Sequence, residues 1–226
     1  MEKYINENDG SFSFIKYVPD FLNEEYIEMI LDELKNDNYF SGETNYGSQI
    51  PRVQKWMHNN DKPFSLLWEK QYERWQPKSY NQNLKTLQNN LVNLYLSNHK
   101  FPDNIKIPEL NSALVNKYRS GKDSIAFHRD NLSEFGENPT IMVVSFGETR
   151  EIKFRRVIYD ANNPKSMKMD RDNKDMNFSI NLENGSLLIM GGSTQKYYAH
   201  GIDKTSDHKD ERYSITFREH TPILKT

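Results

Sequence analysis

Apolar side chains recur at helical spacing in two stretches of the N-terminal half. In residues 21–37 the run extends from Phe21 to Leu34, and Asn23 stands before it as a candidate N-cap. A second run covers residues 83–98 and places five apolar side chains on one face: Leu84, Leu87, Leu91, Leu94 and Tyr95. We therefore predict a helix over each stretch, with its apolar face buried.

The remaining N-terminal segments lack this helical spacing of apolar residues. Residues 11–18 (SFSFIKYV) are predicted to be extended. Residues 39–62 are rich in Gly, Asn and other turn formers around the run IPRVQKWM, which predicts a loop and a hairpin.

From residue 110 onward, short apolar runs alternate with polar turns. The runs are SALVNKY, SIAFH, TIMVVSFG, EIKFRRV, FSINL, GSLLIMGG, YYAHGI and RYSITFR. A spacing of about 10–15 residues with turn signals between runs favours antiparallel strands over βαβ units. Residues 159–177 are polar and are predicted to be a long exposed connection. Helices followed by many strands predict an α+β fold in which the helices pack on one sheet of a jelly-roll core.

Length and composition refine this picture. The 226 residues fit one domain over residues 1–226, in which residues 1–109 carry the helices and the hairpin and residues 110–220 form the jelly roll. The 12 Phe, 13 Tyr and 3 Trp supply large side chains for its core. No stretch has the length of a signal peptide's apolar region or of a membrane span, so we expect a soluble intracellular protein of the nucleus or cytoplasm.

Charge and cysteine content limit the possible chemistry. The 30 Lys and Arg against 32 Asp and Glu neither require nor exclude nucleic acid as a partner. The chain has no Cys, which excludes disulfides, zinc–thiolate sites and thiol nucleophiles. Any metal ion must therefore be bound by His and carboxylate side chains.

One histidine lies two residues from a carboxylate in a predicted strand. His128 and Asp130 would leave an extended segment on the same face, and His200 lies in another predicted strand. Two His and one carboxylate form the facial triad of non-haem iron(II) sites. The alternative is a surface His beside a solvated Asp. None of the other four histidines has a carboxylate two residues away in an apolar, strand-like motif, and the one in TSDHKDE is predicted to lie in a solvated turn: His58, His99, His208 and His220.

Two arginines share one face of the last predicted strand. Arg212 and Arg218 are six positions apart in RYSITFR and alternate with the apolar Tyr213, Ile215 and Phe217. A buried Arg is costly unless it is paired. A carboxylate of a bound ligand would pair it, and so would a structural salt bridge.

In their order along the chain, the motifs NKY, HRD, VSFG, GSLLIMGG, YAHGI and RYSITFR resemble the AlkB family of iron(II)- and 2-oxoglutarate-dependent dioxygenases. The resemblance extends from about residue 51 to residue 218. The segments PRVQKWM and KFRR resemble the eukaryotic-type nucleic-acid dealkylases of this family. The resemblance implies a jelly-roll oxygenase that uses Fe(2+), 2-oxoglutarate and O2.

The resemblance also implies roles for single residues. The iron ligands would be His128, Asp130 and His200. The side chains that hold 2-oxoglutarate would be Asn116, Tyr118 and Arg212. Arg218 would lie close to the metal and help order the co-substrate and substrate region.

Two positions depart from the family pattern. Ser214 stands where the family usually has Asn, which weakens or reroutes a hydrogen bond near the site. Leu132 stands where many repair members have an acidic residue that contacts the flipped base; Asn131 or Glu134 are candidates to replace it. The departure at Leu132 leaves open a substrate other than methylated adenine or cytosine.

Several residues are candidates for substrate binding. In the hairpin, Arg52 is a candidate for holding a phosphate and Trp56 for stacking on an extruded base; a core position for Trp56 is the alternative. Lys153, Arg155 and Arg156 could line a phosphate track, or form a merely solvated face.

The resemblance implies oxidative demethylation of N-alkylated nucleobases in DNA or RNA, which reverses alkylation damage directly. We expect a monomer that binds single-stranded or flipped bases and no membrane. One alternative is the same oxygenase chemistry on another substrate, such as RNA or tRNA in modification or a protein side chain. The other is a non-catalytic jelly-roll binding module.

Overall fold

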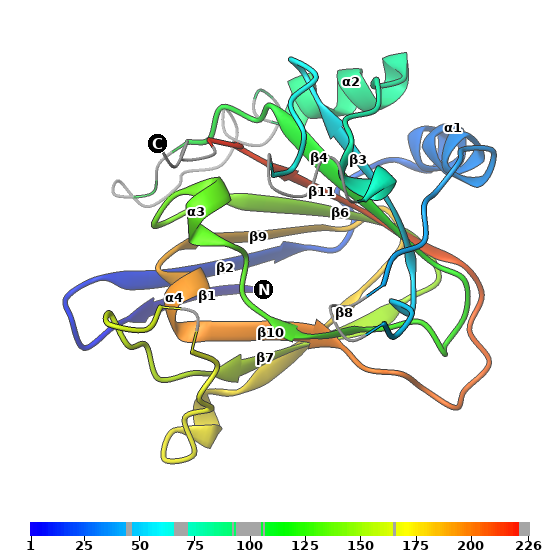
Figure 1. The fold of residues 1–226 in the computed structure, drawn as a ribbon. Helices are drawn as coiled ribbons and strands as arrows, with labels where there is room; N and C mark the ends of the chain where they lie inside the picture. Colours follow the sequence, from blue (N-terminus) through cyan, green and yellow to red (C-terminus); the bar gives the residue numbers. More distant parts are fainter. Residues whose placement is uncertain are drawn as a thin grey trace.

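Two antiparallel sheets face each other in the computed structural model of the protein, which describes residues 1–43, 47–65, 72–91, 93, 105, 107–164 and 166–221 (Figure 1). The larger sheet has the strand order β1 (Glu2–Asn6), β2 (Phe12–Val18), β9 (Leu187–Gly192), β6 (Ile141–Gly147), β11 (Arg212–Arg218), β4 (Ser112–Tyr118) and β3 (Val53–His58). The smaller sheet has the order β5 (Ile125–His128), β10 (Tyr198–Ile202), β7 (Arg150–Arg156) and β8 (Phe178–Leu182).

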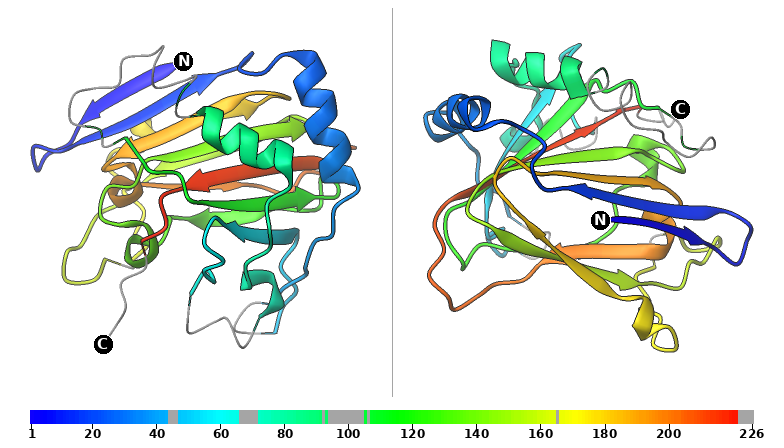
Figure 2. Two further views of the ribbon diagram at one scale, coloured as in Figure 1. Left: turned by 90° about the horizontal axis from the view of Figure 1, so that it is seen from above. Right: turned by 180° about the vertical axis from the view of Figure 1, so that it is seen from behind.

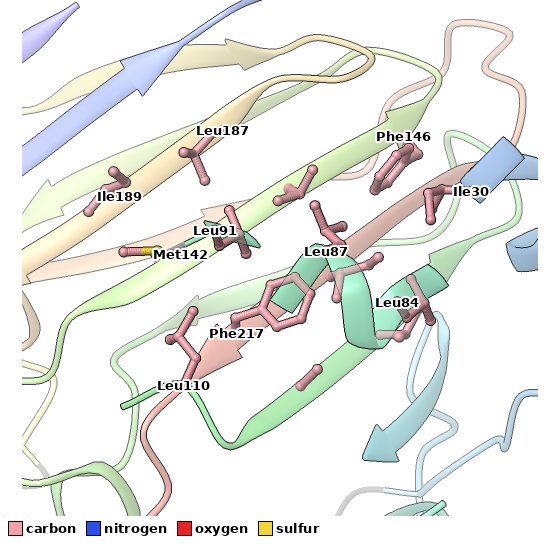
Figure 3. Close-up of a cluster of buried hydrophobic side chains, with 14 of the residues drawn as sticks. Ile30, Leu84, Leu87, Leu91, Leu110, Met142, Phe146, Leu187, Ile189 and Phe217 are labelled. Carbon is pink, nitrogen blue, oxygen red and sulfur yellow. The ribbon is translucent and has the colours of Figure 1, made fainter. Parts of the chain in front are cut away.

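Two helices cover the outer face of the larger sheet (Figure 2). They are α1 (Glu24–Lys35) and α2 (Gln82–Asn90). Asn23 caps α1 by accepting a hydrogen bond from the backbone N–H of Tyr26, as its position before the apolar run predicts. The apolar faces of both helices pack against sheet residues such as Met142 and Phe217 (Figure 3). The predicted helix over residues 83–98 is thus confirmed for its first half, and Leu94 and Tyr95 lie outside the described residues.

The strands of the larger sheet separate two environments by simple alternation. In β11, Tyr213, Ile215 and Phe217 contact the helices, and the four residues between and beside them line a cavity between the sheets: Arg212, Ser214, Thr216 and Arg218. Between the two sheets, apolar side chains from both form a second core. It includes Ile141, Leu188, Phe154 and Leu182. The arrangement confirms the predicted α+β jelly roll.

The structure also contains elements outside the jelly roll and its two covering helices. Strand β1 pairs with β2 at the edge of the larger sheet, and it was not predicted from the sequence. The hairpin expected in residues 39–62 is present, with bridges that join Phe40 to Gln54 and Glu43 to Gln49. Residues 159–177 are largely exposed where the structure describes them, and they contain the short 3-10 helix η3 (Lys174–Met176). Another 3-10 helix, η1 (Glu73–Trp75), follows β3.

Two further short helices, α3 (Leu132–Phe135) and α4 (Thr194–Tyr197), lie at the same end of the two sheets (Figure 1). They follow β5 and β9 in the chain, so they flank the strands that carry the predicted metal ligands. In the described part of the chain, no helix is long and apolar enough to cross a membrane.

Candidate active site

The structure brings the three predicted metal ligands together. His128 ends β5, Asp130 follows it by two residues, and His200 in β10 is the direct register partner of His128. One ligand atom from each residue lies within 4.8 Å of the other two, and the two imidazole centroids are 4.5 Å apart. No other group of three such side chains with this spacing occurs among the described residues.

A glycine permits the close approach of the two histidine strands. Gly201 follows His200 at a point where the register of β10 against β5 shifts. A Cβ atom at this position would lie 2.9 Å from the carbonyl oxygen of Ile125 and 3.0 Å from the backbone nitrogen of Phe127. Both neighbours are backbone atoms, so a side chain would force the strands apart. This glycine belongs to the motif HGI, but no role was predicted for it from the sequence.

Both histidines are held in the neutral form that binds metal ions. Nδ1 of His128 donates to the carbonyl oxygen of Ala126 at 3.0 Å, which leaves Nε2 free as an acceptor. Nδ1 of His200 is buried and has no hydrogen-bond partner in the described part of the structure. Burial lowers the pKa of His128, and burial together with the neighbouring His128 lowers the pKa of His200 to about 3.

Asp130 is held in place from two sides. Its backbone N–H donates to Oε1 of Gln195 at 2.8 Å, and its Oδ2 accepts from Nε of Arg218 at 2.7 Å. Burial acts to raise the pKa of Asp130, but the Arg218 guanidinium holds it below its ordinary value. The carboxylate is therefore ionised, and its orientation is fixed.

A cavity of about 230 Å³ between the sheets contains the triad and a buried arginine. Arg212 is 1% exposed, and it donates from Nη2 to Oγ of Ser145 at 2.9 Å. Its guanidinium lies 5.0 Å from the centroid of the Tyr118 ring. Its Nε and Nη1 atoms are buried and bond to no described group, and no described carboxylate pairs with it. This is the buried unpaired Arg that a carboxylate ligand would complete.

Asn116 lies in the same cavity, on β4. Its Oδ1 accepts from Nε of Arg52 and from Nε2 of Gln54, both at 2.9 Å. Its Nδ2 therefore remains as a donor for a ligand. Arg52 also donates to the carbonyl oxygen of Ser124 at 3.2 Å, and these contacts orient Asn116 within the cavity wall. Arg52 is partly exposed, and its contact with a phosphate stays a prediction.

The sequence matches the model of the 2OG-Fe(II) oxygenase superfamily over residues 14–218. The chain belongs to this superfamily. The three donors of the triad fit an iron(II) ion, and the unpaired Arg212 fits a carboxylate of 2-oxoglutarate.

Relatives of this oxygenase include AlkB proteins, which confirms the resemblance. Alpha-ketoglutarate-dependent dioxygenase alkB homolog 3 of Homo sapiens is 28% identical over 204 residues, which cover 88% of this chain and 64% of that protein. DNA oxidative demethylase ALKBH2 of Arabidopsis thaliana is 30% identical over 116 residues, which cover 48% and 37%. The chain thus matches less than two thirds of the length of either relative.

Solved structures share the fold. The structure of OsALKBH1 superposes with a TM-score of 0.58 at 17% identity, covering 90% of this chain and 97% of that chain. A prolyl hydroxylase in complex with a hypoxia inducible factor oxygen degradation domain peptide fragment, from Trichoplax adhaerens, gives a TM-score of 0.53 at 12% identity, with coverages of 91% and 83%.

Trp56 does not reach the active site of this oxygenase. It is fully buried, donates from Nε1 to the carbonyl oxygen of Lys62 at 2.9 Å, and packs edge-on against Phe64 and His220. Stacking on an extruded base would need an exposed ring face, so Trp56 has the core position that was the alternative. His58 and His220 belong to the same cluster, His208 is exposed and His99 lies outside the described residues.

The three basic residues of β7 do not share one track. Arg156 lies on the opposite face of the strand from Lys153 and Arg155. It is buried there and forms an ion pair with Glu7. Lys153 is paired with Asp203 at 3.0 Å. Arg155 is exposed, and its guanidinium lies 3.9 Å from the centroid of the Phe127 ring, next to His128 in the chain.

Proposed function

We propose that this oxygenase removes alkyl groups from nitrogen atoms of nucleobases in DNA or RNA, with iron(II), 2-oxoglutarate and O2. The observation that carries the proposal is the buried, unpaired guanidinium of Arg212 in the same cavity as the triad. A metal site alone supports many reactions. A metal site together with an anion site in one small cavity supports a co-substrate with two acidic ends.

In this proposal the protein holds iron through His128, Asp130 and His200. Arg212, with the Tyr118 ring beside it, binds the distal carboxylate of 2-oxoglutarate. The free Nδ2 of Asn116 donates to the same ligand, and Arg218 keeps Asp130 in position. All of these groups come from one chain, so a monomer is sufficient for the chemistry.

Bound iron supplies the activation of O2 that accompanies decarboxylation of 2-oxoglutarate. One oxygen atom enters succinate and the other enters the substrate, so that N–CH3, O2 and 2-oxoglutarate give N–CH2OH, succinate and CO2. The C–N bond of the hydroxymethyl group then breaks, the nitrogen gains a proton, and formaldehyde leaves. The role of the protein is to orient both substrates and to exclude water.

The AlkB relatives support nucleic acid as the substrate class, because one is named a DNA oxidative demethylase. Arg155 supports it from this chain, since its exposed guanidinium lies on the ring of Phe127, which lines a cavity beside His128, and has no paired carboxylate in the described structure. Such a group suits a backbone phosphate. A base must leave a duplex to reach the cavity, which favours single-stranded or damaged targets.

The test is a product assay on the iron-loaded protein with 2-oxoglutarate, ascorbate and air. Methylated single-stranded DNA and RNA are compared with a methylated peptide, and succinate, formaldehyde and restored base are measured. The proposal predicts formaldehyde equal to restored base, lost in His128→Ala and in Arg212→Ala. Turnover of the peptide without turnover of any nucleic acid would overturn it.

A further inference from the structure

A second cavity, of about 440 Å³, adjoins the metal triad without including Arg212. It shares His128 and Asp130 with the co-substrate cavity, so a ligand in it would lie beside the metal. Apolar atoms make up most of its lining surface, and four of its ten described lining residues are apolar: Phe127, Leu132, Pro164 and Met167. An apolar cavity with a few polar groups is the usual form of a site for a flat organic ligand such as a nucleobase.

Among the described residues, no free carboxylate lines this second cavity. Asp130 is the only carboxylate among the described residues that line it, and Arg218 already holds that carboxylate. Glu134 does not line the cavity, and its carboxylate lies 3.8 Å from Nε2 of His220. Leu132 occupies the position that faces the cavity from the start of α3.

A positive charge stands in the wall. Arg129 donates to the carbonyl oxygens of Lys196 at 2.9 Å, Pro164 at 2.5 Å and Ser166 at 2.7 Å. These bonds hold the loop that carries Pro164 against the metal strand. Carbonyl groups satisfy the donors of the guanidinium but do not neutralise its charge, so a cationic ligand would be repelled.

One polar group of the wall is an available donor. The Oδ1 of Asn131 accepts from the backbone N–H and from Oγ of Ser133, at 3.2 and 2.8 Å. Its Nδ2 bonds to no described group, and Asn131 lines the cavity. The fixed carboxamide therefore offers an N–H to a ligand, which suits a carbonyl oxygen.

Alkylated bases fall into two classes by charge. Alkylation of a ring nitrogen that held only a lone pair, as in adenine and cytosine, produces a cation. Alkylation of a ring nitrogen that carried a proton beside a carbonyl group, as in thymine, uracil and guanine, leaves the base neutral. Burial of a cation in an apolar wall without a counterion is costly, whereas a neutral base with carbonyl oxygens meets both the apolar wall and the Asn131 donor.

We infer that the enzyme selects neutral N-alkylated bases with a carbonyl group beside the alkylated nitrogen, and that Leu132 sets this preference. The inference rests on the proposed function and names its substrate class. The direct comparison is N3-methylthymine with N3-methylcytosine, because the two pyrimidines have nearly the same shape and differ in charge.

The experiment places each base singly in the same single-stranded oligonucleotide. Both kcat/KM and, without oxygen, the dissociation constant are measured for the wild-type protein, Leu132→Asp and the matched neutral control Leu132→Asn. Leu132 is partly exposed, and binding of 2-oxoglutarate checks that each variant is folded. We expect the wild type and Leu132→Asn to prefer the neutral base by about tenfold or more, and Leu132→Asp to shift the ratio toward the cation by a similar factor.

A wild-type preference for the cationic base, or a ratio that Leu132→Asp leaves unchanged, would overturn the inference while the dealkylase function stood. If no methylated base binds or reacts, although 2-oxoglutarate is still decarboxylated, the proposed function itself fails. The two failures are therefore distinguishable.

Discussion

The Nε atom of Arg218 and the Oδ2 atom of Asp130 are 2.7 Å apart, and both side chains are buried. This hydrogen bond joins β11 of the larger sheet to the loop after β5. The other oxygen of the carboxylate, Oδ1, lies 3.8 Å from Nε2 of His128. One oxygen of Asp130 is thus held by the protein, and the other remains beside the histidines.

Removal of the Arg218 side chain should weaken iron binding. In Arg218→Met the carboxylate of Asp130 loses the partner that orients it, and loss of such an outer partner typically lowers metal affinity by about 10–100-fold. Arg218→Lys keeps the charge and should lose less. An anaerobic iron(II) titration followed by calorimetry measures both, and an unchanged affinity in Arg218→Met would show that the contact does not orient the ligand.

Arg212 and Arg150 provide a matched pair of buried arginines. The guanidinium of Arg150 bonds to the carbonyl oxygens of Ser120, Asp123 and Asp203, whereas two nitrogens of Arg212 have no described partner. Arg150→Leu should lower the free energy of unfolding by about 2–4 kcal/mol, because three carbonyl oxygens, one in a buried and two in partly buried hydrogen bonds, lose their donor.

Arg212→Leu should leave the stability of the ligand-free protein unchanged or higher, because an unpaired buried charge is removed. It should weaken 2-oxoglutarate binding by about 2–5 kcal/mol. Chemical denaturation and calorimetry give the two quantities. A destabilised Arg212→Leu protein that still binds 2-oxoglutarate normally would contradict the assigned role.

Gly201→Ala should disturb the metal site with little change elsewhere. The added Cβ meets backbone atoms of Ile125 and Phe127 at about 3 Å, so β5 must move away from β10 and His128 from His200. We expect a loss of iron affinity of about tenfold or more, as for other changes in ligand position. Retention of full affinity would mean that the strands tolerate the methyl group, and the glycine would then have no positioning role.

Arg155→Ala should weaken binding of single-stranded oligonucleotides, and Lys153→Ala should have a smaller effect. Arg155 is exposed and has no paired carboxylate among the described residues, whereas Lys153 is paired with Asp203. Loss of one phosphate contact lowers the slope of log affinity against log salt by about 0.7 for a single strand. Fluorescence anisotropy at several salt concentrations measures the slope, and equal slopes in Arg155→Ala and wild type would exclude the contact.

His58 should make the protein less stable as the pH falls. Burial, with His220 nearby, lowers the pKa of His58 from 6.5 to about 4, and its Nδ1 accepts from the backbone N–H of Asn60. The unfolded state therefore takes up a proton first, so the stabilising contribution is complete above about pH 6.5 and is lost as the pH falls toward 4.

The free energy of unfolding of His58→Gln should fall less steeply over this range than that of the wild type. His208→Gln is the matched control for the loss of one histidine, since His208 is exposed. Denaturant unfolding at a series of pH values tests this, and parallel curves for wild type and His58→Gln would contradict it.

Patterns that repeat along a strand were read correctly from the sequence. The alternation in RYSITFR placed Arg212 and Arg218 on one face, because side chains of a strand alternate whatever its neighbours are. The spacing of His128 and Asp130 predicted a shared face for the same reason, and the structure brings His200 to them.

Positions that depend on distant partners were predicted wrongly or left open. Arg156 and Arg155 are neighbours in sequence, and only the contact with Glu7, far away in the chain, shows that Arg156 is buried. The surroundings of Trp56 come from Lys62, Phe64 and His220, so its core position needed the fold. The edge strand β1 has few apolar residues, and its pairing with β2 defines it.

The central claim is that one cavity holds both the metal and the co-substrate. Calorimetric titration of 2-oxoglutarate, without oxygen, into the iron-loaded and the iron-free protein tests it most directly. We predict that iron raises the affinity for 2-oxoglutarate by about tenfold or more, that His200→Ala loses this coupling, and that Arg212→Leu loses 2-oxoglutarate binding while it keeps iron. Equal affinity for 2-oxoglutarate with and without iron would show that the two sites are separate, and would contradict the account.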